Sequence, residues 1–292
     1  MKTPIIIVGM ARSGTTLASH LLGSSQDVYS EIEPHILWKC GSFSSLGDDQ
    51  YTHNVSCIKW IREKLLSNAQ SKVLVEKSPP NCIRPNLVHS VFPDAKIVYV
   101  ERDPVRCIDS NFKRSISNDS LKFSIILKKY LISSGSSDLA GAIGKRKLHQ
   151  QLRVRDVPLF VIYFLRMLFL RGVSKTLPFG PKLSDYGKYV KKNGVLSYHV
   201  KVFVEASKCK AKFQSLYGSN FKVFTLERFQ SDLEEVKIMY AFCGLPVDEY
   251  AITLAAKSIS KERVKNAVQK GPHDDEIEQL LTELLQKEKS GV

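Results

Sequence analysis

The stretch Val8 to Leu17 (VGMARSGTTL) constrains this chain more than any other part of its sequence. Gly9 and Gly14 are separated by four residues, and the stretch continues the apolar run Ile5–Val8. A strand that leads into a glycine-rich turn and then a helix gathers backbone N–H groups and a helix N-terminus at one point, where anions bind. The sequence therefore predicts a phosphate-binding loop at the start of an α/β fold.

This loop differs from that of nucleoside triphosphatases after its second glycine. Those enzymes place a lysine there, which reaches the β- and γ-phosphates, followed by a Ser or Thr that holds Mg²⁺. Here Thr15 and Thr16 follow Gly14, and the loop carries its positive charge earlier, on Arg12. The loop thus favours transfer of an anionic group without a metal over hydrolysis of ATP.

Alternating strand and helix signals extend the α/β prediction along the chain. Asp103–Pro104 is a strong helix start, because Asp is a good N-cap and Pro suits the first helical position. Such alternation is typical of a parallel sheet with crossover helices. We expect strands at 5–8, 72–76, 96–100 and 222–226, and helices at 14–23, 85–91, 103–115, 232–242 and 275–287.

The pattern weakens between about residues 117 and 197, a region that is basic and contains a Ser/Gly cluster at 133–137. We expect a mainly helical, variable insert there, within a single domain that spans residues 1–292. The nucleotide-binding core would then consist of about residues 1–116 and 198–292. We see no internal repeat.

A second anion site is predicted where the strand 96–100 ends. In IVYVERDPVRCIDS, Arg102 follows the strand, at the edge where open α/β sheets bind ligands, and Ser110 lies on the next helix. We expect Arg102, and not Glu101, to face the ligand, so this strand end offers no carboxylate for Mg²⁺. An Arg fork and a hydroxyl can clamp a phosphate, although a lone strand-end Arg more often forms a salt bridge. Two anion sites together predict a ligand phosphorylated at two places.

These two motifs, in this order and on these elements, resemble those of the sulfotransferase superfamily that uses 3′-phosphoadenosine 5′-phosphosulfate (PAPS). The Arg-Ser-Gly-Thr-Thr form looks like that of the tyrosylprotein sulfotransferases and related bacterial-type enzymes. The resemblance covers residues 4–116 well and 221–245 loosely, and it is weak over 117–197. It implies a three-layer P-loop-type parallel sheet flanked by helices, and in-line transfer of a sulfuryl group to a hydroxyl or amine.

The resemblance also implies which residues hold the donor. The 5′-phosphosulfate would lie at the loop, and the 3′-phosphate at the second motif. No metal is required, because cationic side chains would supply the charge that Mg²⁺ supplies elsewhere. The implied donor-binding residues are Arg12, Ser13, Gly14, Thr15, Thr16, Arg102 and Ser110.

The catalytic base follows from the same resemblance. Tyrosylprotein-type enzymes carry a Glu base shortly after the first helix, and Glu33 in QDVYSEIEPH takes that position. Glu31 and His35 are the alternatives, and an exposed acidic loop without a catalytic role is the plain structural interpretation.

Lys77, directly after KVLVE, matches a Lys that points at the sulfuryl group, so we assign transition-state stabilisation to Lys77 and Arg12. The alternative for Lys77 is a structural ion pair with Glu76 or Glu101. Ser258 and Ser260, in the segment 258–261, match poorly the serine-and-basic segment that closes over the cofactor in relatives, and we favour a polar loop there.

The segment 157–170 (VPLFVIYFLRMLFL) is apolar apart from Arg166. At about 14 residues it is too short to span a bilayer, which takes ~20. It is either a buried helix of the insert or a docking helix for an apolar or membrane-borne acceptor, helped by Arg153, Arg155 and Arg171. The acceptor itself stays open among a glycan, a lipid headgroup, a small alcohol and a protein tyrosine.

Composition sets the remaining expectations. The net charge of +14 favours anionic partners such as a phosphorylated cofactor, nucleic acid or an acidic membrane. Because the positive charge is spread without aromatic interleaving, a nucleic-acid-binding protein is disfavoured. A nucleotide-dependent kinase is the other alternative, but this chain lacks the lysine that a kinase of this type would need at position 15. Six cysteines without CxxC or metal spacing predict reduced, mostly buried thiols, with one or two disulfides as the alternative. With no signal peptide in view, we expect a cytoplasmic protein, or else a processed luminal domain.

Overall fold

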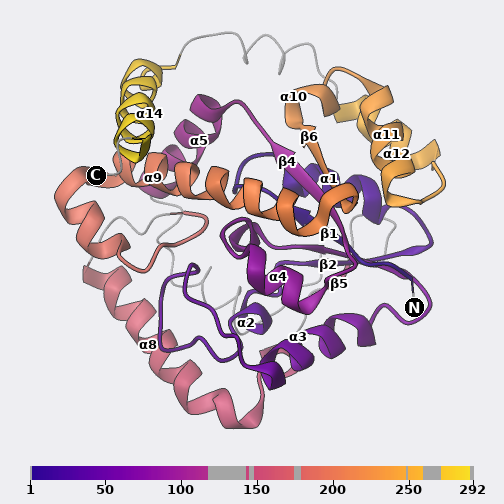
Figure 1. Cartoon of the computed structure of the whole chain (residues 1–292), viewed down its shortest axis with the longest axis horizontal. Coiled ribbons are helices and arrows are strands. Elements are labelled where there is room, and N and C mark those ends of the chain that lie inside the picture. The colour runs from indigo at the N-terminus through magenta and orange to yellow at the C-terminus, as the bar shows by residue number, and fades with distance from the viewer. Residues whose placement is uncertain are drawn as a thin grey trace.

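The computed structural model describes residues 2–117, 143–144, 148–173, 179–247, 249–258 and 271–289. Its described strands form one sheet in the order β5-β2-β3-β1-β4-β6, and neighbouring strands pair in parallel (Figure 1). The predicted α/β fold with a parallel sheet is confirmed. The strands are β1 (Ile5–Val8), β2 (Val28–Ile32), β3 (Val73–Lys77), β4 (Lys96–Glu101), β5 (Ile143–Gly144) and β6 (Phe221–Thr225).

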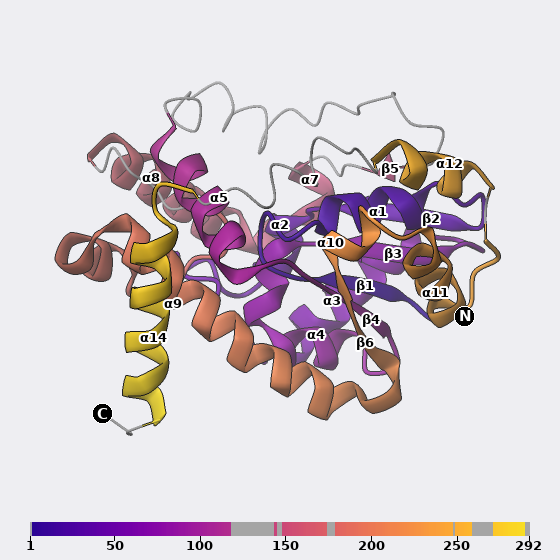
Figure 2. The same cartoon turned by 90° about the horizontal axis from the view of Figure 1, so that it is seen from above.

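Helices cover both faces of this sheet, as Figure 2 shows with α1, α11 and α12 on one side and α4 and α9 on the other. The α-helices are α1 (Thr15–Gly23), α2 (His35–Trp38), α3 (Val55–Ser67), α4 (Pro85–Val91), α5 (Pro104–Ile116), α7 (Leu148–Gln151), α8 (Val157–Val173), α9 (Tyr186–Tyr217), α10 (Leu226–Phe229), α11 (Leu233–Cys243), α12 (Glu249–Ser258) and α14 (Asp274–Lys289). Short 3-10 helices are η1 (Pro79–Ile83), η3 (Val154–Asp156) and η4 (Gly218–Asn220).

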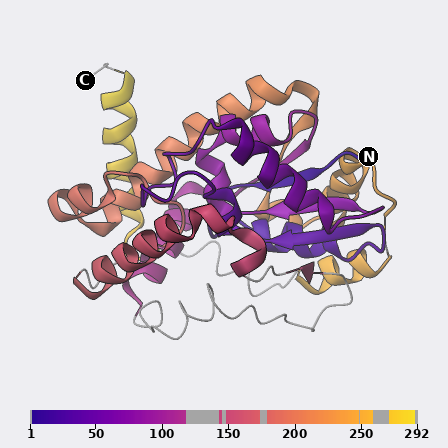
Figure 3. The same ribbon diagram turned by 90° about the horizontal axis from the view of Figure 1, so that it is seen from below.

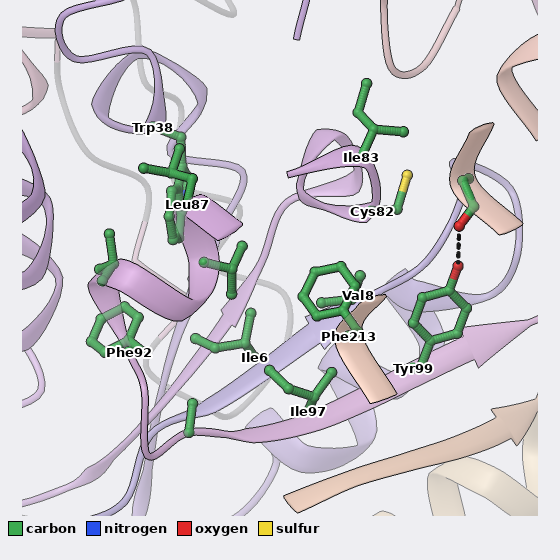
Figure 4. Close-up of a cluster of buried hydrophobic side chains, with 14 of the residues drawn as sticks. Ile6, Val8, Trp38, Cys82, Ile83, Leu87, Phe92, Ile97, Tyr99 and Phe213 are labelled. Carbon is green, nitrogen blue, oxygen red and sulfur yellow. Dashed lines mark hydrogen bonds between the residues drawn. The ribbon is translucent and has the colours of Figure 1, made fainter. Parts of the chain in front are cut away.

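The core is double because successive strand side chains point to opposite faces. On β1, Ile5 and Ile7 belong to the cluster under α1 and α11, whereas Ile6 and Val8 belong to the cluster under α3, α4 and α9. All four are fully buried, which explains why the strand has no polar alternation. Figure 4 shows the second cluster, in which the Tyr99 hydroxyl donates a hydrogen bond to the Ala206 carbonyl at 3.3 Å.

Helix starts follow their capping residues. The Asp103 carboxylate accepts from the Arg106 amide at 2.9 Å, with Pro104 at the first position of α5, as the sequence predicted. Asn54 caps α3 and Asp232 caps α11 in the same way. At the end of α11, Gly244 adopts a left-handed conformation (φ 70°), which a glycine takes without strain.

The sequence prediction missed β2, β5, α2, α3, α10 and α12. The strand β2 (VYSEI) buries the polar residues Ser30 and Glu31, so its sequence lacks the apolar run by which an interior strand is predicted. The long helix α9 passes through the expected boundary near residue 197, with non-helical backbone at Gly194 (φ 83°). The six cysteines are all free, and five of them are buried.

Candidate functional site

The predicted site residues gather at one edge of the sheet, where the parallel strands β1 to β4 have their carboxyl ends (Figure 1). Strand β1 lies between β3 and β4, and its register pairs Ile7 with Lys77 and Val8 with Tyr99. Strand β2 pairs Ile32 with Lys77. Residues that follow these four strands therefore meet at the point where the strand order reverses, which is where open α/β sheets bind ligands.

The loop between β1 and α1 requires glycine at two places. A Cβ on Gly9 would lie 2.3 Å from the Val100 carbonyl oxygen and 2.8 Å from Ser13 Oγ. Gly14 has φ +101°, and a Cβ there would lie 2.7 Å from Leu226 Cδ1. Arg12 also has a positive φ of 70°, so the backbone reverses direction sharply before α1 begins.

The start of α1 is open to an anion. Gly14 is its N-cap and provides no side-chain cap, and Thr15 and Thr16 are its first residues. The first N–H groups of a helix lack intrahelical partners and carry partial positive charge. Ser13 Oγ is buried and has no hydrogen-bond partner among the described residues. This orphaned hydroxyl and the glycine-lined turn fit a bound phosphate group.

The second predicted motif meets the loop directly. Arg12 Nε donates to Ser110 Oγ at 3.1 Å, and Arg102 Nη1 donates to the Arg12 carbonyl at 3.3 Å. Within the part of the chain that the structure describes, no carboxylate forms an ion pair with either arginine. Glu101 pairs instead with Lys210 Nζ at 2.7 Å. Two guanidinium groups and a hydroxyl thus lie beside the loop, and neither guanidinium group forms an ion pair with a described carboxylate.

Glu33 lies at the centre of a third group of contacts. Its Oε1 accepts from Lys77 Nζ at 2.7 Å and its Oε2 lies 3.1 Å from His35 Nε2. Lys77 Nζ also lies 3.4 Å from Thr16 Oγ1, so it joins the carboxylate to the start of α1. Lys77 is 2% exposed and Glu33 31% exposed, which leaves the carboxylate accessible from solvent. Burial, and secondly the charge of Lys77, lowers the pKa of His20.

Two of the other glutamates considered from sequence, Glu31 and Glu76, are buried. Glu31 and Glu76 are register partners on β2 and β3, and both are fully buried. Glu31 accepts from the Tyr29 hydroxyl at 2.9 Å, and Glu76 accepts from Trp38 Nε1 at 2.9 Å. Burial, reinforced by the charge of Glu31, raises the pKa of Glu76 to about 7. The ion pair of Lys77 is therefore with Glu33, and not with Glu76 or Glu101 as the structural alternative proposed.

One positioning residue was missed by sequence reasoning. Asn111 Nδ2 donates to the Ala11 carbonyl at 2.7 Å and to the Cys107 carbonyl at 2.8 Å, so it fixes the loop to α5. Its position next to Ser110 is the one sequence signal that could have identified it. Ser258 is the last residue of α12, and Ser260 lies outside the described residues.

The chain was compared with curated proteins and with solved structures. A comparison with curated proteins gave no match. Among solved structures, a sulfotransferase domain from the curacin biosynthetic pathway is 15% identical, with 94% of this chain and 82% of that chain covered and a TM-score of 0.47. A sulfotransferase from Alicyclobacillus acidocaldarius is 18% identical (85% and 83% covered, TM-score 0.43). Mouse sulfotransferase SULT7A1 complexed with PAP is 14% identical (93% and 69% covered, TM-score 0.41).

The family model described as "Sulfotransferase family" matches residues 4–157, just over half of the chain. The matched region contains the phosphate loop, Glu33, Lys77, Arg102 and Ser110. Because the match includes the predicted site residues that the sheet edge brings together, sequence and geometry agree: this chain belongs to the Sulfotransferase family, whose chemistry is sulfuryl transfer.

Proposed function

We propose that this protein transfers a sulfuryl group from PAPS to a hydroxyl or amine of its acceptor, with Glu33 as the general base. The observation that carries the proposal is the contact between the two anion motifs, Arg12 Nε to Ser110 Oγ at 3.1 Å. It supports a ligand with two anionic groups held by one continuous set of donors. PAPS has a phosphosulfate and a separate 3′-phosphate, and when bound it supplies the sulfuryl group.

The residues present suit such a donor. The loop, with the buried hydroxyl of Ser13 and the open start of α1, would hold the 5′-phosphosulfate. Arg102 and Ser110 would hold the 3′-phosphate, since a guanidinium fork and a hydroxyl form short, charge-assisted hydrogen bonds to phosphate oxygens. Arg12 lies between the two sets, bonded to Ser110 through its side chain and to Arg102 through its carbonyl.

Glu33 and Lys77 have different roles in this proposal: Glu33 accepts a proton, and Lys77 stabilises negative charge. Glu33 is accessible and would accept the proton of the acceptor hydroxyl at a carboxylate oxygen. His35, on the other oxygen at 3.1 Å, holds the carboxylate in place. Once Glu33 is protonated it no longer carries the charge that holds Lys77. The ammonium group is then available to stabilise the negative charge that develops during transfer, together with Arg12.

The surroundings of the two alternatives favour Glu33 as the base. Glu31 is fully buried and bonded to Tyr29, so it has no exposed oxygen to offer an acceptor. His35 is bonded to Glu33 and would act through it. The acceptor class is a hydroxyl-bearing molecule, for which a glycan, a lipid, a small alcohol and a tyrosine peptide are the candidates to screen with labelled donor.

Calorimetric titration with adenosine 3′,5′-bisphosphate tests the donor. We expect binding without Mg²⁺, weakened at least about tenfold in Arg102→Ala, because a hydrogen bond to a charged group contributes about 1.5–3 kcal/mol. Arg228→Ala is the matched control, since Arg228 is exposed and pairs with Glu235 at 3.6 Å. Preferential binding of Mg-ATP would refute the proposal and favour a kinase.

Turnover of Glu33→Gln tests the base. The amide keeps the size of the side chain and cannot accept the proton, so we expect intact donor binding and a loss of about 10²-fold or more in turnover. Glu234→Gln is the control, because Glu234 is exposed and pairs with Lys237 on α11. Unchanged turnover would remove Glu33 from the role and leave His35 to be tested in the same assay.

A further inference from the structure

The helix α8 buries only one of its faces. Phe160 and Tyr163 pack against Phe43, with ring centroids 5.7 and 5.8 Å apart, and Ile36 completes the cluster. The opposite face is apolar and exposed, and Figures 1 and 3 show α8 along the outside of the molecule. This docking face consists of Val154 in η3 and of Val157, Val161, Ile162, Leu165 and Phe169 in α8.

The spacing of these residues makes the docking face continuous. Val157, Val161 and Leu165 are four residues apart, and side chains at that spacing lie above one another on a helix. Exposure rises to 58% at Leu165, 71% at Phe169 and 90% at Val154. Contiguous exposed apolar side chains of this size mark an interaction surface in a protein, whereas scattered single ones do not.

Positive charge borders the docking face. The sequence of α8 contains no Asp or Glu. Arg166 donates to the Ser44 carbonyl at 2.9 Å, and Arg155 donates to Ser56 Oγ at 2.8 Å. Both partners are neutral, and no described carboxylate forms an ion pair with either arginine. Arg153, in contrast, is neutralised by Asp156. An apolar stripe flanked by guanidinium groups that have no described carboxylate partner is complementary to a surface with an apolar interior and an anionic outer layer.

We infer that the docking face lies in the interface of an anionic membrane. Within the described ranges, no helix combines the length and hydropathy of a bilayer-spanning segment. A helix that buries one apolar face and keeps cations beside it lies parallel to the membrane plane, with arginines near the lipid phosphates. A second copy of the chain fits less well, because a two-fold contact would bring the same arginines together without an acidic partner.

The buried face of α8, opposite the docking face, packs next to the loop that carries Glu33. Ile36, in the cluster beneath α8, directly follows His35, which contacts Glu33. Binding at this face would hold that loop near the lipid surface. The inference does not depend on the proposed donor or base, since membrane binding is measured without either.

Cosedimentation of the full chain with vesicles tests the inference. We expect binding to phosphatidylcholine vesicles that contain phosphatidylserine, weaker binding to phosphatidylcholine alone, and weakening by salt. Ile162→Ser/Leu165→Ser should reduce the partition coefficient at least about tenfold, because two half-buried aliphatic side chains no longer enter the interface. Arg166→Gln should reduce it about fivefold.

Leu285→Ser, on α14, is the matched control, since Leu285 is 45% exposed and lies outside the docking face. Its partition coefficient should equal that of the parent chain, and circular dichroism should show all variants folded. Binding that depends on Arg166 but not on Ile162 and Leu165 would mean adsorption of a basic protein and would overturn the inference. A concentration-dependent dimer that the double variant dissolves, without vesicle binding, would assign the face to a second copy.

Discussion

The buried carboxyl of Glu76 gives the stability of this protein a specific dependence on pH. Burial, with the charge of Glu31, raises the pKa of Glu76 from its ordinary 4.5 to about 7, against the hydrogen bond from Trp38 and the charge of Lys77. At about 1.4 kcal/mol per pKa unit, this difference corresponds to about 3 kcal/mol.

The sign of the effect follows from proton binding. Below pH 4.5 the folded and unfolded chains both carry the proton, and Glu76 costs nothing. Between 4.5 and about 7 the unfolded chain loses the proton first, so the free energy of unfolding falls as pH rises. Above about pH 7 the free energy of unfolding no longer falls on account of Glu76. Between pH 5 and pH 8 the fall amounts to about 2 kcal/mol.

Glu76→Gln isolates this contribution. The amide stays neutral at every pH, can still accept from Trp38, and can donate to Asn81 Oδ1, which has no partner among the described residues. Relative to the parent chain, the variant should be about 2 kcal/mol more stable at pH 8 than at pH 5. Urea unfolding followed by circular dichroism at the two pH values measures this.

Two controls make the measurement specific. Glu63→Gln removes an exposed carboxylate on α3 that pairs with Lys59 at 3.8 Å, and it should change stability equally at both pH values. Burial lowers the pKa of His199 to about 4, so this residue makes the protein less stable as pH falls from 6.5, which is the opposite direction. The contribution of His199 is the same in variant and parent, and it cancels when the two are compared. An equal difference at pH 5 and pH 8 for Glu76→Gln would refute the reasoning.

Two further predictions concern the loop and a buried ion pair. In Gly9→Ala the new Cβ meets the Val100 carbonyl of β4, so affinity for adenosine 3′,5′-bisphosphate should fall at least about tenfold by calorimetry. Gly187→Ala, where a Cβ meets open space, should bind as the parent does, and equal binding by both variants would contradict the steric argument. Arg84→Met leaves Asp48 buried without its main partner; burial alone would raise the pKa of Asp48, and Arg84 and Lys39 hold it low. We expect a loss of about 3–5 kcal/mol in urea unfolding, and a cost no larger than that of Lys59→Met would show that the pair contributes little.

Local signals alone were sufficient for the phosphate loop and the helices that flank it. The β-branched run 5–8, the glycines at 9 and 14 and the Asp103–Pro104 cap act within a few residues of the backbone they shape. For that reason the strand, the loop, α1 and the start of α5 could be predicted from sequence. The family match over 4–157 includes the same segment.

Contacts between distant segments could not be predicted in this way. The pair Lys77–Glu33 joins residues 44 apart in sequence, and Arg12–Ser110 joins residues 98 apart. The resemblance named these side chains but not their partners, and the structural alternative for Lys77, an ion pair with Glu76 or Glu101, was wrong. Strand order and register decide such contacts, because residues that follow separate parallel strands meet where those strands end together.

The difference between local signals and tertiary contacts also explains what could not be predicted about β2 and α8. The sequence of β2 places Ser30 and Glu31 where a buried strand should be apolar, and only pairing with β3 shows that Glu31 lies beside Glu76. The sequence of α8 is apolar nearly all round, and only packing on Phe43 and Ile36 decides which face is covered. Composition and local pattern therefore determined the chemistry of the phosphate loop, whereas tertiary packing decided which charges meet and which apolar surface remains exposed.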